Sequence, residues 1–119
     1  MADKAMPWDR MSLPRADVDA ALAWLEIANT PLSRAWVTAL AWHVWHRLST
    51  WGLWGLVHGF DSSRGQYTID SRKVTGRLTR DLQRWQLASA DGALTPFGLL
   101  VRRLAWPESP AARSGRARA

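Results

Sequence analysis

Residues 72–86 have the sequence RKVTGRLTRDLQRWQ, and the spacing of their apolar side chains predicts the helix around which the fold is built. The apolar residues recur at intervals of four, four and three positions, which is typical of one face of an α-helix. They are Val74, Leu78, Leu82 and Trp85. At about 100° per residue this stripe covers about 80° of the helix surface. We therefore expect a helix over residues 72–86 that buries one narrow face.

The remaining surface of this helix is polar and basic. Its side chains can donate hydrogen bonds, and one glycine allows close approach of another molecule. These residues are Arg72, Lys73, Thr75, Gly76, Arg77, Thr79, Arg80, Gln83 and Arg84. Asp81 lies beside the apolar stripe, within reach of Arg77 and Arg84, so we expect a structural ion pair there rather than a catalytic carboxylate.

Turn and cap signals predict the elements after this helix. Asp91-Gly92 suits the positive φ of a tight hairpin between short strands at residues 87–89 and 93–95. Thr95 and Pro96 then begin a last helix that ends near Trp106. Its inward face is predicted to hold Phe97, Leu100, Val101 and Leu104.

Two helices are predicted in the first half of the chain. One begins near Pro14 and reaches Asn29, with Val18, Ala21, Leu22, Leu25 and Ala28 at helical spacing. The second begins with Thr30 as its cap and Pro31 in its first turn, and runs to about Ser49. The face of this second helix that we expect in the core contains Trp36, Leu40, Val44 and Leu48, and continues to Trp51.

The opposite face of the second predicted helix also contains large aromatic side chains. It carries Arg34, Thr38, Trp42 and Trp45. So much apolar surface needs a partner, and two arrangements fit it. One is a twofold contact with the same helix of a second subunit, and the other is burial against the first helix of the same chain.

The segments between and beyond these helices carry weaker signals. Residues 51–57 are apolar but contain Gly52 and Gly55, so a short buried helix and an irregular connector both fit. Residues 61–65 predict a polar turn and residues 67–69 a short strand, after which Asp70 or Ser71 can cap the basic helix. We expect one domain over residues 13–106, a flexible segment before it, and a flexible basic tail at residues 107–119 with Arg113, Arg116 and Arg118.

The positive charge of the chain lies in its second half. The 119 residues carry a formal net charge of +6. Residues 1–60 contain five Lys and Arg against five Asp and Glu, whereas residues 61–119 contain eleven against five. Such an uneven field attracts polyanions, of which nucleic acid and anionic membrane are the usual candidates.

Several classes of protein are disfavoured by the sequence. The absence of cysteine excludes disulfides and thiolate metal sites, and we expect a cytoplasmic protein. The Trp-rich tract of residues 36–60 is interrupted by histidine, arginine and glycine, so we expect no transmembrane helix, and Asp3 and Asp9 argue against a signal peptide.

No enzyme signature is present. His43, His46, His58 and Asp61 could in principle bind a divalent metal, but the HxxH pair lacks the glutamate of zinc proteases. No nucleophile, phosphate-binding loop or dinucleotide fingerprint appears. We therefore expect no catalysis, metal, cofactor or small-molecule ligand.

The order of elements over residues 67–106 resembles the winged helix-turn-helix superfamily. Residues 74–85, VTGRLTRDLQRW, look like its recognition helix, and LTPFG at residues 94–98 is similar to the turn that follows the wing in MarR-like regulators. The resemblance implies a mainly α fold with a small β-hairpin, in a winged helix-turn-helix-like single domain. It also implies that the basic helix contacts DNA.

The physical argument agrees with the resemblance, because a major groove about 12 Å wide admits one helix that is apolar behind and rich in donors in front. We expect a homodimeric protein that binds specific double-stranded DNA, as a transcriptional regulator of bacterial, phage or plasmid origin. Arg72, Lys73 and Arg84 are assigned to phosphates, and Arg77 to either kind of contact. The residues assigned to base edges or close backbone approach are Thr75, Gly76, Thr79, Arg80 and Gln83.

Other functions fit part of the sequence. A replication, partition or excision factor would use the same DNA-binding surface. A protein-interaction module would instead use the face around Trp42 and Trp45. A peripheral membrane protein is disfavoured because the surplus tryptophans and the basic residues lie on different predicted helices.

Overall fold

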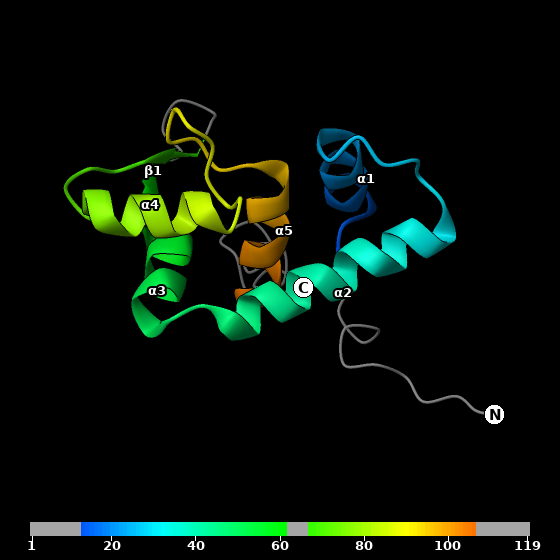
Figure 1. The fold of residues 1–119 in the computed structure, drawn as a ribbon, viewed down its shortest axis with the longest axis horizontal. Coiled ribbons are helices and arrows are strands. Elements are labelled where there is room, and N and C mark those ends of the chain that lie inside the picture. The colour runs from blue at the N-terminus through cyan, green and yellow to red at the C-terminus, as the bar shows by residue number, and fades with distance from the viewer. Residues whose placement is uncertain (1–12, 62–66, 107–119) are drawn as a thin grey trace, which may run out of the picture.

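A computed structural model describes residues 13–61 and 67–106, which form five α-helices and two short strands (Figure 1). In chain order the elements are α1 (Arg15–Trp24), α2 (Pro31–Arg47), α3 (Thr50–His58), β1 (Phe60–Asp61), β2 (Thr68–Ile69), α4 (Gly76–Arg84) and α5 (Pro96–Ala105). The prediction of a mainly helical fold with a small antiparallel element is confirmed. The predicted terminal segments 1–12 and 107–119 lie outside the described residues, as does most of the predicted turn at residues 61–65.

α1 ends at Trp24, five residues before the predicted end of this helix. Glu26 has a φ of 60°, and its N–H donates to the carbonyl oxygen of Ala23 at 3.1 Å. The N–H of Ile27 donates to the carbonyl oxygen of Leu22 at 3.0 Å. These two bonds form a Schellman motif, which closes the helix. Glycine usually occupies the left-handed position of this motif, but here the position holds Glu26. The sequence therefore contains no signal that the helix ends here.

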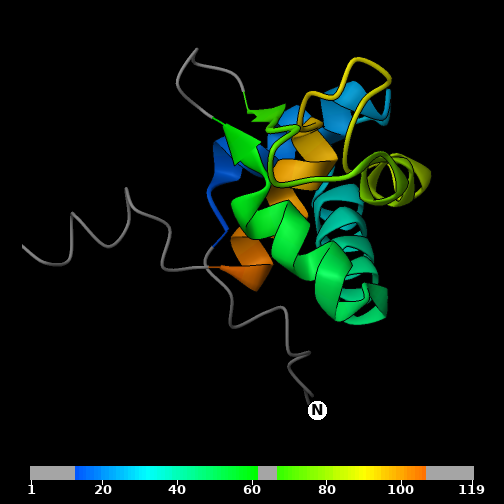
Figure 2. The same cartoon turned by 90° about the vertical axis from the view of Figure 1, so that its left-hand side faces the viewer.

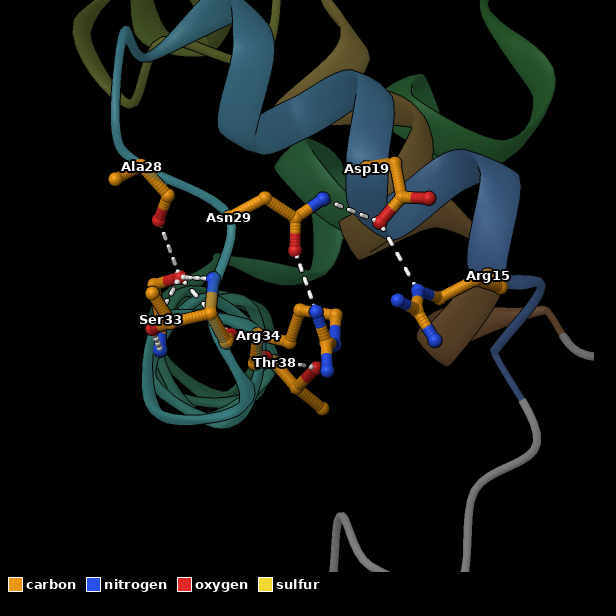
Figure 3. Close-up of polar contacts among 8 residues, drawn as sticks. Arg15, Asp19, Ala28, Asn29, Ser33, Arg34 and Thr38 are labelled. Atoms are coloured by element: carbon orange, nitrogen blue, oxygen red, sulfur yellow. Dashed lines mark hydrogen bonds and ion pairs between the residues drawn. The ribbon is translucent and has the colours of Figure 1, made fainter.

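Polar side chains connect α1 to the start of α2 (Figure 3). Oδ1 of Asp19 accepts hydrogen bonds from Nε of Arg15 at 3.1 Å and from Nδ2 of Asn29 at 2.7 Å. Oδ1 of Asn29 in turn accepts from Nη1 of Arg34 at 2.6 Å. The hydrogen bond from Asn29 lowers the pKa of the Asp19 carboxyl, and Arg15 lowers it further. This chain of bonds fixes the angle at which α2 leaves the loop.

α2 begins at Pro31 as predicted, after a capping box. Oγ1 of Thr30 accepts from the N–H of Ser33 at 3.0 Å, and Oγ of Ser33 accepts from the N–H of Thr30 at 2.8 Å. The two side chains thereby satisfy two donors that the first turn of a helix leaves without partners. Residues 48 and 49 follow the helix instead of belonging to it.

The predicted core face of α2 is confirmed for Val44, Leu40 and Leu48, which are buried or pack against the core, but is wrong at its ends, Trp36 and Trp51. Val37, Ala41 and Val44 are buried, whereas Trp36 is 48% exposed and Trp51, which belongs to α3, is 71% exposed. The buried side of α2 is thus centred about 50° around the helix from the predicted one, and Val44 belongs to both. The small side chains of Val37 and Ala41 allow α1 and α5 to pack closely on α2, and a large indole cannot fill the same space.

α5 lies between α1 and α3 and packs against α1, α2 and α3 (Figure 1). Oγ1 of Thr95 accepts from the N–H of Gly98 at 2.8 Å, and Pro96 occupies the first turn, as the sequence predicts. The predicted inward residues Phe97, Leu100, Val101 and Leu104 are all buried. The N-terminal turn of α5 touches the hairpin so closely that a Cβ at position 98 would lie 2.1 Å from the carbonyl oxygen of Leu87.

The β-structure is smaller than predicted but has the predicted turn. β1 and β2 pair in antiparallel orientation. Residues 87–95 form the hairpin with a single bridge between Ala88 and Leu94, and Gly92 has a φ of 83° at its tip. A bridge between Thr68 and Ala93 joins the hairpin to β2. In residues 13–61 and 67–106, no helix combines the length and apolar character needed to cross a bilayer.

Candidate nucleic-acid interface

α4 is shorter than the predicted helix, which was expected to span residues 72–86. Thr75 is its N-cap, with Oγ1 accepting from the N–H of Leu78 at 3.4 Å. Its C-terminal end repeats the closure of α1, because Gln86 has a φ of 61° and the N–H of Leu87 donates to the carbonyl oxygen of Leu82 at 2.9 Å. Figure 2 looks nearly along α4, which lies at the edge of the molecule.

Arg72 and Lys73 precede α4, so the prediction that they lie on the helix is wrong. Asp70 caps a separate turn here: its Oδ1 accepts from the N–H of Arg72 at 3.0 Å, and its carbonyl oxygen accepts from the N–H of Val74 at 3.0 Å. The backbone hydrogen bond from Arg72 lowers the pKa of the Asp70 carboxyl. Nε of Arg72 also lies 3.3 Å from Oδ1, but the arginine side chain is 87% exposed, so solvent weakens this ion pair.

The inward side of α4 and of the preceding turn contains the predicted apolar stripe. Val74 and Leu82 are buried, and Leu78 and Trp85 are half-buried. Leu78 packs against α3 at Gly55, where an added Cβ would lie 2.7 Å from its Cδ2. The stripe therefore fixes which side of α4 faces solvent.

The outward side of α4 carries Arg77, Arg80 and Arg84, all exposed. At about 100° and 1.5 Å per residue they lie within about 60° of the helix surface and span about 10 Å along its axis. None of the three forms an ion pair with a carboxylate of residues 13–61 or 67–106. The predicted ion pair of Asp81 with Arg77 or Arg84 is therefore wrong, although the half-buried Asp81 lines the same groove as Arg77.

Three other predicted contact residues have hydrogen bonds within the chain. The hydroxyl of Thr79 donates to the carbonyl oxygen of Thr75 at 3.0 Å, and the Thr75 hydroxyl caps α4. Nε2 of Gln83 donates to the carbonyl oxygen of Ser89 at 2.9 Å. That amide attaches the hairpin to α4, so we withdraw the assignment of Gln83 to a base edge. Gly76 stays open, with no other atom within 4 Å of an added Cβ.

Two basic residues of the second half have structural contacts. Nε of Arg103 lies 2.8 Å from Oδ2 of Asp17 and joins α5 to α1. Arg102 is only 8% exposed, and its Nη2 donates to the carbonyl oxygen of Val57 at 3.1 Å. Its guanidinium lies 5.0 Å from the ring centroid of Tyr67 and 5.1 Å from that of Trp106. Burial lowers the pKa of Arg102. Both arginines thus form contacts within the chain, Arg102 to Val57 and Arg103 to Asp17.

The face of α2 that was predicted to need a partner forms most of its contacts within the same chain. Trp42 and Trp45 are half-buried and pack against the core, with their ring centroids 5.1 Å apart in an edge-to-face arrangement. The guanidinium of Arg34 donates to Asn29, and the hydroxyl of Thr38 donates to the carbonyl oxygen of Arg34 at 2.9 Å. Trp42 and Trp45 are thus partly buried within their own chain, and a twofold contact through this face stays a prediction.

A groove of about 560 Å³ lies between α3 and the start of α4. Trp51 and Trp54 contribute indole rings to it, and Lys73 and Arg77 contribute positive charge. Residues 50–58 form a helix. Of the two predictions for residues 51–57, the helix is therefore correct and the irregular connector is wrong. No local pattern signals this groove, because its aromatic and basic residues lie more than 15 positions apart in the chain.

The histidines considered as metal ligands do not gather into a site. Nδ1 of His46 donates to the carbonyl oxygen of Trp42 at 2.9 Å, and its ring lies 4.3 Å from that of Trp42. The ring of His58 lies between those of Trp54 and Trp106, at 5.8 and 5.7 Å. Within the described residues, no three His, Cys, Asp or Glu side chains are grouped so that they could hold a metal ion.

Comparison of the chain with protein-family models, curated proteins and solved structures gives no match.

Proposed function

We propose that the protein binds double-stranded DNA by placing α4 in the major groove. The observation that carries this proposal is the row of Arg77, Arg80 and Arg84, which are exposed and without a carboxylate partner in the described part of the chain. On the other side of the same helix Leu82 is fully buried. A helix with an apolar back and a donor-rich front is the element that a major groove accommodates.

The exposed residues divide into two kinds of contact. Arg80 lies in the middle of α4, where its planar guanidinium can donate two hydrogen bonds to guanine. Arg84 at the end of the helix, with Arg72 and Lys73 on the turn before it, would contact phosphates and fix the register of the helix. Arg77 can serve either purpose, and the open space at Gly76 permits close approach of the backbone.

The surroundings of α4 support a winged-helix arrangement. β2, α4, the hairpin of residues 87–95 and α5 follow each other in the order that this superfamily uses. Asp91 lies at the hairpin tip, and a hydrogen bond from the Ser89 hydroxyl lowers the pKa of its carboxyl. We assign the hairpin no groove contact, because this carboxylate would be repelled by phosphate.

We further propose that the protein is a homodimeric transcriptional regulator of bacterial, phage or plasmid origin. A twofold dimer would present two copies of α4 to two half-sites of a palindromic operator. A replication, partition or excision factor would use the same surface, and the identity of the bound site in the genome distinguishes these roles.

The test is fluorescence anisotropy of labelled duplexes titrated at several salt concentrations, after selection of a preferred site. Arg80→Ala is expected to cost about 1–3 kcal/mol on that site and to relax its specificity, whereas Arg84→Ala should weaken all sequences alike. Arg47→Ala is the control, because it removes an exposed arginine at the end of α2, away from α4. It should leave the affinity for DNA almost unchanged. Equal effects of all three variants would contradict the proposal.

A further inference from the structure

We infer that the groove between α3 and the start of α4 binds an unstacked nucleobase with its phosphate, so that the protein engages single-stranded DNA next to a duplex. The inference rests on the proposed function to the extent that α4 is taken to contact the adjoining duplex. It adds a second mode of recognition, because the residues that line this groove from α3 take no part in major-groove contacts.

The groove offers aromatic surface for stacking. Trp51 is 71% exposed and Trp54 is 38% exposed, and their ring centroids are 6.3 Å apart at an interplanar angle of 74°. Exposed indoles are a standard platform for bases of single strands, since every base has a π-face whatever its sequence. The groove volume of about 560 Å³ lies within the range of small-molecule sites, which is ample for one base and its sugar.

The charge on the groove matches the backbone of the same ligand. Lys73 and Arg77 line it, and neither pairs with a carboxylate of residues 13–61 or 67–106. Asp81 is the acid in the lining, so the two cations give the groove a net positive charge. Aromatic rings beside cations are the combination that single-strand-binding grooves use, whereas a purely apolar partner would leave both cations without a counter-charge.

The position of the groove connects the two modes of binding. Arg77 both lines the groove and belongs to the exposed row on α4. A strand that leaves the duplex at the N-terminal end of α4 would therefore pass from the arginine row directly onto Trp51. We expect the protein to prefer a duplex with a single-stranded extension over a blunt duplex.

The experiment compares three labelled probes by anisotropy: a blunt duplex, the same duplex with a single-stranded extension of about ten nucleotides, and that single strand alone. The variants are Trp51→Ala and, as a matched control, Trp36→Ala, which removes an exposed indole on α2 outside the groove. Trp51→Ala should lower affinity for the extended duplex about tenfold and leave the blunt duplex unchanged, and Trp36→Ala should change neither.

A second pair of variants keeps the test valid if Trp51→Ala folds poorly. Trp51→Phe retains a ring that can stack and should keep most of the affinity for the extended duplex, whereas Trp51→Leu retains only apolar volume and should lose it. Far-UV circular dichroism checks the fold of each variant. Equal affinities of Trp51→Phe and Trp51→Leu would overturn the inference.

The outcomes separate this inference from the proposed function. If the extension gives no gain, or if Trp51→Ala and Trp36→Ala behave alike, the inference fails while duplex binding by α4 still stands. If the single strand binds through Trp51 but the blunt duplex is not bound at all, the proposed major-groove function fails instead. Light scattering that shows Trp51-dependent self-association without DNA would assign the groove to a second protein chain and overturn the inference.

Discussion

Gly98→Ala is expected to destabilise the fold strongly, because the first turn of α5 lies directly against the backbone of the hairpin. A Cβ at this position would lie 2.1 Å from the carbonyl oxygen of Leu87 and 2.9 Å from Cδ1 of Leu94. α5 would have to move away by about 1 Å, which as overpacking costs about 1–3 kcal/mol. The movement also weakens the 3.0 Å bond from the N–H of Thr95 to Leu87, worth about 1 kcal/mol.

The free energy of unfolding should therefore fall by about 2–4 kcal/mol, and the melting temperature by about 10–20 °C for a domain of this size. Gly76→Ala is the matched control, since no atom lies within 4 Å of the added Cβ and alanine favours the helix. It should gain up to about 1 kcal/mol. Urea unfolding followed by circular dichroism measures both variants. A loss below about 0.5 kcal/mol for Gly98→Ala, within the range of neutral surface changes, would refute the packing of α5 on the hairpin.

Three further predictions concern the elements that hold the site. Leu82→Ala removes a fully buried side chain behind the arginine row and should cost about 2–5 kcal/mol in urea unfolding; a smaller loss would mean that α4 is loosely packed. Glu26→Gly should raise the melting temperature, because Glu26 has a φ of 60° and a non-glycine residue there costs about 1 kcal/mol; no gain would argue against the Schellman closure of α1. The folded pKa of Asp19 lies below its unfolded value of 3.8, so its contribution to stability is complete above that pH and is lost as the pH falls through the folded pKa. The difference in stability between the wild type and Asp19→Asn should therefore shrink on acidification, and a constant difference would contradict the bond to Asn29.

Elements with explicit local signals could be predicted from the sequence. Thr95 with Pro96 marks the start of α5, and Asp91-Gly92 marks the hairpin tip, because cap and turn residues act on backbone groups a few positions away. The end of α1 could not be predicted, since Glu26 occupies a position where glycine is the usual signal.

The inward face of α2 could be predicted only in part, for a different reason. Its sequence has large apolar residues on almost every side, so a helical period alone does not choose between the faces. Packing of α1 and α5 selects the side with the small residues Val37 and Ala41, and the indole of Trp36 is left on the surface. In α2, therefore, the side with the largest apolar residues is not the side that packs most closely against the neighbouring helices.

The basic face of α4 could be predicted because it lies on one short helix, but the amount of exposed charge could not. Arg102 and Arg103 are held by partners 45 and 86 positions away, at Val57 and Asp17, and no local pattern signals such contacts.

Apart from these two arginines, residues 67–106 carry five exposed cations on α4 and the turn before it, at positions 72, 73, 77, 80 and 84. With Arg72, Lys73 and Arg84 on phosphates and Arg77 on either kind of contact, three or four phosphates are neutralised, and the slope of log K against log salt is about −2.7 to −3.6 for one chain. A clearly steeper, more negative slope would require a second copy of the chain or cations outside the described residues. A slope near −1 would mean that the arginine row does not face the DNA backbone at all.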